Sequence, residues 1–115
     1  MSARLVDGRE MAERIRLRLA DEVRSLSAGG LPPRLVSLES SGDEAGQIYI
    51  KSQARHCAEI GIDYSVRKIP PGATEAQFVA HILSLDHDPG VTGVLLQLPV
   101  PRGIEPGLVF ADWEK

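Results

Sequence analysis

The chain has 115 residues, enough for one small domain with a single hydrophobic core but not for two. Hydrophobic residues make up 43% and charged residues 25% of the chain, as in ordinary globular proteins. The net charge of −3 gives no electrostatic preference for nucleic acid or for an anionic membrane surface, so neither is an expected partner. The N-terminus lacks an apolar signal-peptide stretch and no apolar run approaches membrane-spanning length, so we expect a cytoplasmic protein.

The first element that the sequence predicts is a helix over residues 7–26. Its apolar residues recur at spacings of three and four and share one face: Met11, Ile15, Leu19, Val23 and Leu26. Asp7 is the expected N-cap, because its carboxylate can accept hydrogen bonds from the free amides of the first turn. The arginines of this segment alternate with acidic residues, which indicates a solvated face rather than a phosphate-binding stripe.

The rest of the chain alternates strands and helices. We expect strands over residues 34–39, 62–69 and 91–98, and helices over residues 44–60, from Thr74 to about Leu85, and from Glu105 to the end. Thr74 and Gln77 form a capping box, after which Phe78, Ile82 and Leu85 face inward. The predicted fold class is therefore α/β, a three-layer and mostly parallel open sheet with helices on both faces. Residues 1–115 form one domain in this interpretation.

A ligand of such a sheet is expected beyond the carboxyl ends of the strands. Two segments fall there: the helix start after Glu39, which carries Tyr49 and Gln53, and the strand exit at Gln97. Tyr49 and Gln53 are four residues apart on a helix, so they share one face and can contact the same small molecule. Each feature also has an ordinary explanation, since helical tyrosines usually pack and strand-end glutamines are usually solvated.

The sequence contains few other catalytic patterns. The sequence contains no G-x-G-x-x-G, no G-x-x-x-x-G-K-[ST] and no H-E-x-x-H, and its three histidines show no metal-ligand spacing. We therefore expect neither a bound cofactor nor a metal in this chain. Cys57 is the only cysteine, and its place in a helical pattern predicts a small buried side chain rather than a reactive thiol.

Two longer segments carry a resemblance to a known family. Residues 46–62, GQIYIKSQARHCAEIGI, are similar to the pattern S-x-x-Y-V-x-x-K followed by a helix ending in E-x-G-I. Residues 93–101, GVLLQLPVP, are similar to G-[IL]-[LI]-V-Q-L-P-L-P, and the opening LVDGR at residues 5–9 is similar to I-D-G-K. These are motifs of bifunctional methylenetetrahydrofolate dehydrogenase/cyclohydrolase, and the resemblance to its catalytic domain spans nearly the whole chain.

The resemblance implies a role in one-carbon folate metabolism. The family oxidises 5,10-methylenetetrahydrofolate with NADP or NAD and hydrolyses the methenyl product to 10-formyltetrahydrofolate. By this resemblance, Tyr49 stacks on or borders the pterin ring, and Gln97 lines the active site and tunes the neighbouring catalytic group. Leu98 and Pro99 shape the pocket wall. A tetrahydrofolate derivative is then the expected small-molecule partner.

The sequence departs from the family in two ways. Gln53 stands where the family has its catalytic lysine, and Gly46 stands where it has a serine. A lysine can be tuned into a proton donor or acceptor near neutral pH, whereas glutamine does not titrate. The family's later K-D-V-D-G-F segment and its Rossmann cofactor domain are also absent from these 115 residues. We therefore expect a truncated catalytic domain, incomplete at its C-terminal end and inactive alone.

Several functional interpretations stay open. The chain is either a folate-site scaffold without catalysis or half of a split enzyme that a cofactor-domain partner completes. It is alternatively an interaction module that has lost folate binding, which the replacements at Gln53 and Gly46 favour, or an unrelated doubly wound domain. Apolar surface left uncovered by the missing segment would allow a homo-oligomer.

Overall fold

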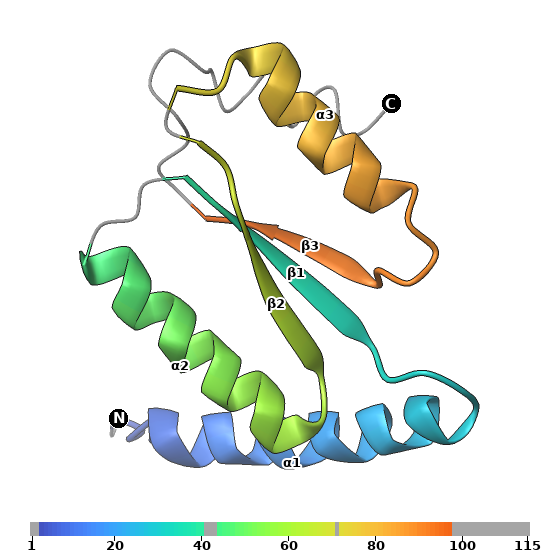
Figure 1. The fold of residues 1–115 in the computed structure, drawn as a ribbon. Coiled ribbons are helices and arrows are strands. Elements are labelled where there is room, and N and C mark those ends of the chain that lie inside the picture. The colour runs from blue at the N-terminus through green and yellow to red at the C-terminus, as the bar shows by residue number, and fades with distance from the viewer. Residues whose placement is uncertain (1–2, 41–43, 71, 98–115) are drawn as a thin grey trace.

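The computed structural model describes residues 3–40, 44–70 and 72–97. In this part of the chain helices and strands alternate in the predicted order (Figure 1): α1 (Gly8–Ala28), β1 (Arg34–Glu39), α2 (Glu44–Ile60), β2 (Asp63–Lys68), α3 (Glu75–Asp86) and β3 (Gly93–Leu96). No helix of these ranges is long and apolar enough to cross a membrane. The predicted helix from Glu105 lies outside the described residues.

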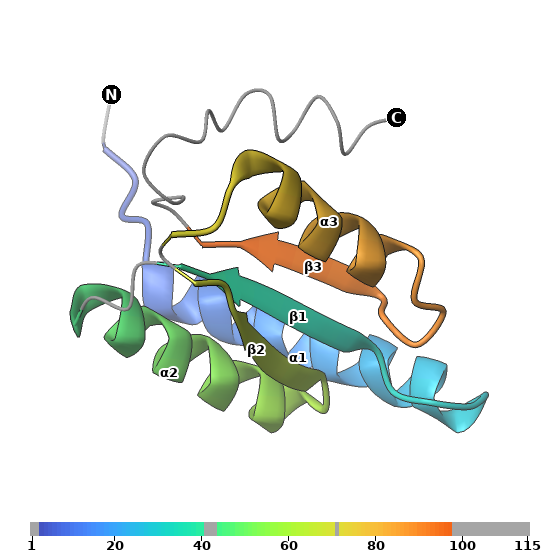
Figure 2. The ribbon, with the colours of Figure 1, turned by 45° about the horizontal axis from the view of Figure 1, so that its top comes forward.

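The three strands form one parallel sheet in the order β2-β1-β3. The chain steps from β1 to β2 and then returns across β1 to β3. Two crossovers of the same hand in opposite directions place their helices on opposite faces of a sheet. Figure 2 shows this arrangement, with α1 and α2 on one face and α3 on the other. The predicted α/β fold, with three layers and a parallel sheet, is confirmed.

The main apolar core lies between α3 and the sheet. The capping box at the start of α3 is confirmed, because the Thr74 hydroxyl accepts from the Gln77 amide and the Gln77 side chain accepts from the Thr74 amide. The capping box fixes where the helix begins, and the three residues predicted to face inward are buried. The buried side chains between α3 and β1 are Val36, Leu38, Phe78, Ile82 and Leu85.

The other face of the sheet is covered by α2, which ends at a glycine. Gly61 has a φ of 89°, a conformation that is strained for any residue with a side chain. The Ile62 amide then donates to the Cys57 carbonyl over 2.9 Å, which is the terminating bond of a Schellman motif. Cys57 itself is buried, as predicted, and burial raises the pKa of its thiol. This cysteine is therefore a packing residue and not an activated nucleophile.

The helix α1 is capped as predicted but packs differently from its pattern. Asp7 accepts hydrogen bonds from the amides of Arg9 and Glu10, and the expected pairing of arginines with acidic residues is present on the solvated face. Of the apolar residues on the other face only Val23 is buried; Met11, Ile15, Leu19 and Leu26 are exposed within the described structure. The 3.6-residue period identified the helix correctly, but a period does not determine what covers the apolar face.

The third strand is shorter than predicted. It spans Gly93–Leu96 instead of residues 91–98, and its residues are half-buried rather than covered on both faces. Within the described ranges β3 pairs with β1 alone and forms one edge of the described three-stranded sheet. An edge position explains why an apolar run of this length is not fully buried here.

Candidate functional site

The central strand carries two buried polar residues on the face that α2 covers. Side chains alternate along a strand, so Val36 and Leu38 face α3 whereas Ser37 and Glu39 face α2. Ser37 is 0% and Glu39 3% exposed, which is unusual for polar groups unless they have hydrogen-bond partners. Neither residue was among the predicted site residues. The signal was present in the sequence, because S-L-E interrupts an otherwise apolar strand at every second position.

Gln97 reaches these groups from the end of β3. Its backbone amide donates to the Leu38 carbonyl over 2.9 Å, which extends the β1–β3 pairing by one residue. Its side-chain Nε2 donates to the Ser37 Oγ and to the Gln53 Oε1, each over 2.9 Å. The structure thus joins Gln53 and Gln97, two residues selected from sequence segments 44 positions apart.

A second strand residue, Tyr64 of β2, completes the cluster. Its hydroxyl donates to the same Gln53 Oε1 over 2.8 Å, so this oxygen accepts two hydrogen bonds. Burial raises the pKa of Tyr64, and the hydrogen bond with Ser37 lowers it by less. The hydroxyl therefore remains a protonated donor at neutral pH. Sequence reasoning missed Tyr64, since it occupied an expected position in an alternating strand.

The remaining predicted site residues are placed less closely. Tyr49 lies one turn before Gln53 on α2 and is 58% exposed, so its ring is accessible to a ligand. Leu98 and Pro99 lie outside the described residues. Among the residues that the structure does describe, no three histidine, cysteine, aspartate or glutamate side chains are grouped as a metal site.

Glu39 is only partly satisfied. The Gln47 Nε2 of α2 donates to its Oε1, but its Oε2 is buried and has no hydrogen-bond partner among the described residues. A buried carboxylate oxygen without a partner costs free energy that folding must offset. Glu39 is therefore expected to lower the stability of the fold locally, beside the polar cluster.

Replacing Glu39 tests this interpretation. Glu39→Leu is expected to raise the free energy of unfolding by about 1 kcal/mol, because it removes a buried unpaired oxygen while half-buried Gln47 can bind water instead. Urea denaturation measures the change, with Glu59→Leu at an exposed position of α2 as the control. A loss of stability in Glu39→Leu alone would show that the carboxylate has a stabilising partner.

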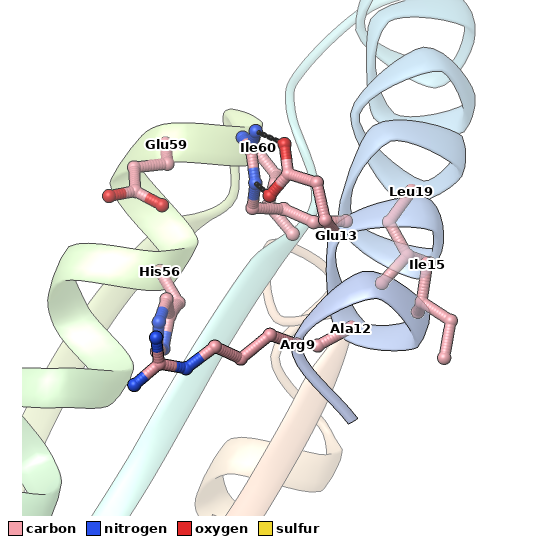
Figure 3. Close-up of a pocket in the computed structure, with 9 residues that line it drawn as sticks. Arg9, Ala12, Glu13, Ile15, Leu19, His56, Glu59 and Ile60 are labelled. Carbon is pink, nitrogen blue, oxygen red and sulfur yellow. Dashed lines mark hydrogen bonds and ion pairs between the residues drawn. The ribbon is translucent and has the colours of Figure 1, made fainter. Parts of the chain in front are cut away.

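A separate groove runs between α1 and α2 (Figure 3). It has a volume of about 530 Å³, and Ile15, Leu19 and Ile60 form its apolar part. Arg9, Glu13, Arg16, His56 and Glu59 provide charged or polar groups around it, and Arg16 pairs with Glu13. The groove includes residues of the family-like segments, but the predicted site residues that the structure describes, Tyr49, Gln53 and Gln97, do not line it. The polar cluster is therefore separate from this groove.

The chain is similar to known proteins over most of its length. The model of the tetrahydrofolate dehydrogenase/cyclohydrolase catalytic domain matches residues 6–112. The chain belongs to this family. The bifunctional protein FolD of Geobacillus thermodenitrificans is 39% identical over 104 residues, and the mitochondrial methylenetetrahydrofolate dehydrogenase/cyclohydrolase of Drosophila melanogaster is 35% identical over 103 residues.

These matches cover most of this chain and a minor part of each relative. They span 90% and 89% of the chain but only 37% and 33% of the two proteins. FolD of Campylobacter jejuni has the same fold with a TM-score of 0.86 at 31% identity, over 92% of this chain and 38% of that one. This chain therefore spans about a third of the length of these relatives.

Proposed function

We propose that this chain forms the folate-binding part of a methylenetetrahydrofolate dehydrogenase/cyclohydrolase and binds a tetrahydrofolate derivative at the carboxyl end of its sheet. The observation that carries the proposal is the 2.9 Å hydrogen bond between Gln97 and Gln53. It brings the two family-like segments together at the edge where parallel sheets bind ligands. In this proposal Tyr49 stacks on the pterin ring, Gln97 lines the site, and Leu98 and Pro99 shape its wall.

We further propose that the chain does not catalyse the family reactions by itself. Gln53 occupies the position of the family lysine, and an amide neither gives up nor accepts a proton near neutral pH. In this structure its Oε1 accepts hydrogen bonds from Tyr64 and Gln97. The surroundings of position 53 therefore suit a hydrogen-bond acceptor. Cyclohydrolase chemistry, which requires proton transfer, is expected to be lost.

The described residues do not fit a nicotinamide cofactor. A dinucleotide pyrophosphate binds at a glycine-rich turn between a strand and the helix after it, where backbone amides meet the phosphates. The sequence has no such motif, and the buried carboxylate of Glu39 ends the first strand, where a second negative charge is unfavourable. We propose that NADP or NAD, if used, binds to a different domain or protein. A solved family structure from Trypanosoma brucei contains NADP.

The proposal predicts how Tyr49 affects binding. Tyr49→Ala is expected to weaken the binding of 5-formyltetrahydrofolate about tenfold, because stacking of a heterocycle on an aromatic ring is worth roughly 1–3 kcal/mol. Calorimetric titration measures this, with Ile48→Ala as the matched control, since Ile48 is the exposed neighbour on the same helix. Equal affinities of Tyr49→Ala and the wild type would contradict the assigned role of Tyr49.

Two alternatives have distinct outcomes in the same assays. If the chain is half of a split enzyme, adding a cofactor-binding partner with 5,10-methylenetetrahydrofolate and NADP should produce NADPH. If it is an interaction module, the wild type should not bind 5-formyltetrahydrofolate at all. The expected cytoplasmic location stays a prediction, since the Drosophila relative is named as mitochondrial.

A further inference from the structure

The orientation of the Gln53 amide is determined by its neighbours. Two donors, the Tyr64 hydroxyl and the Gln97 Nε2, meet at the Gln53 Oε1 over 2.8 and 2.9 Å. Both donors come from the sheet, so the carbonyl oxygen is directed toward the strands. Because the oxygen and the nitrogen of a carboxamide point apart, the Gln53 Nε2 is directed away from these two donors.

That nitrogen is the part of Gln53 available to a ligand. Within the described ranges it donates no hydrogen bond to the protein, and the residue is half-buried at the face where Tyr49 is exposed. A carboxamide nitrogen carries two N–H donors and no charge. Position 53 is thus arranged to donate hydrogen bonds to an acceptor atom, such as a carbonyl oxygen or a ring nitrogen.

We propose that Tyr64 is a positioning residue, whose hydroxyl holds the Gln53 oxygen and so presents the Gln53 –NH2 group as a neutral hydrogen-bond donor to the bound ligand. This inference rests on the proposed folate site and adds to it a residue that neither family-like segment contains. Ser37 supports the arrangement from the central strand, because its hydroxyl accepts from the Gln97 Nε2. The cluster therefore joins α2, β1, β2 and the residue that follows β3, and its hydrogen bonds favour one orientation of the Gln53 amide.

The state of the Tyr64 hydroxyl suits this role. Burial raises its pKa above the ordinary value, and the Glu39 carboxylate acts in the same direction. A tyrosine whose pKa is raised in the folded protein keeps its proton until the pH exceeds the usual tyrosine range. The donor to Gln53 is therefore present throughout the neutral range. Unlike a lysine, the Gln53 amide does not titrate, so its contribution to ligand affinity should stay constant across the neutral pH range.

Tyr64→Phe tests the proposal, because it removes one hydroxyl and keeps the ring. We expect the affinity for 5-formyltetrahydrofolate to fall roughly three- to tenfold, the usual effect of losing one hydrogen bond. Ser25→Ala, which removes a hydroxyl from the distant helix α1, should leave the affinity unchanged. In the double variant Tyr64→Phe/Gln53→Ala, the affinity should be no weaker than in Gln53→Ala alone, since Tyr64 acts through Gln53. Fully additive losses would overturn the positioning role.

A second measurement reads the same contact without ligand. In NMR spectra of the ligand-free protein, the side-chain amide resonances of Gln53 should shift in Tyr64→Phe and stay in place in Ser25→Ala. Unchanged resonances in Tyr64→Phe would overturn the proposal even if the affinity falls. Absence of any folate binding by the wild type would overturn the proposed function, and with it the ligand-facing role of Gln53. The amide resonances would still show in that case whether Tyr64 orients the side chain.

Discussion

Gln53→Lys is expected to raise the rate of methenyltetrahydrofolate hydrolysis by roughly 10²-fold over the wild type, at the low end of what a general acid or base contributes. The substitution restores a titratable group at the position where the family has its catalytic lysine. Lysine burial in a site of this kind lowers its pKa toward neutrality, so that it can transfer a proton to or from the attacking water. Loss of the methenyl absorbance at constant pH measures the rate.

The neighbours of position 53 can accommodate the change by reversing their hydrogen bonds. An ammonium group has three donors and no acceptor, so it cannot replace the Gln53 oxygen as it stands. The Tyr64 hydroxyl can instead accept from the ammonium, and rotation of the Gln97 amide by half a turn presents its Oε1 to it. This rearrangement costs some of the gain, which is why we expect the lower end of the range.

The control for this experiment is Gln53→Met. Methionine is of similar length but can neither titrate nor attract a developing negative charge. It should therefore stay at the wild-type rate. A Gln53→Lys rate that does not exceed the Gln53→Met rate would show that the site lacks more than a proton-transfer group, which favours the interaction-module interpretation. Measuring folate binding by both variants would then distinguish two explanations. Retained binding would indicate a pocket that lacks catalytic groups, and lost binding would indicate that the pocket itself is absent.

The sequence predicted only some residues of the hydrogen-bonded cluster, for a physical reason. Gln53 and Gln97 were found because each lies in a family-like segment, and parallel strands bring their carboxyl ends to one edge. Tyr64 and Ser37 were not found, because an alternating strand predicts which residues share a face but not which of them meet a helix residue. The contact between Tyr64 and Gln53 depends on how α2 lies across β2, which no local pattern encodes.

The predictions about the fold were likewise correct for some elements and wrong for others. The inward residues of α3 were predicted correctly because the apolar stripe of this helix is packed on the sheet and its capping box fixes where it starts. The apolar stripe of α1 has an equally clear period, yet Leu26 is 63% exposed and Met11 is 51% exposed in the described structure. Periodicity therefore identifies a face that favours burial, and only the tertiary arrangement determines whether it is buried.

This difference can be measured with two substitutions of the same kind. Phe78→Ala is expected to lower the free energy of unfolding by about 3–5 kcal/mol, because Phe78 is 1% exposed and its ring fills the core between α3 and β1. Small domains have a total stability of about 5–15 kcal/mol, so this loss is a large fraction of it. The variant should therefore unfold at a much lower urea concentration than the wild type. Circular dichroism during urea denaturation gives the value.

Leu26→Ala removes a large apolar side chain from α1 and is expected to change the free energy of unfolding by no more than about 0.5 kcal/mol, as at other exposed positions. The pair of variants thus compares a buried apolar stripe with one that is exposed in the described part of the chain. A cost above about 2 kcal/mol for Leu26→Ala would show that the face of α1 is buried in solution. Repeating that measurement over a range of protein concentrations would then identify the cover, because burial against a second copy makes stability depend on concentration and burial within one chain does not.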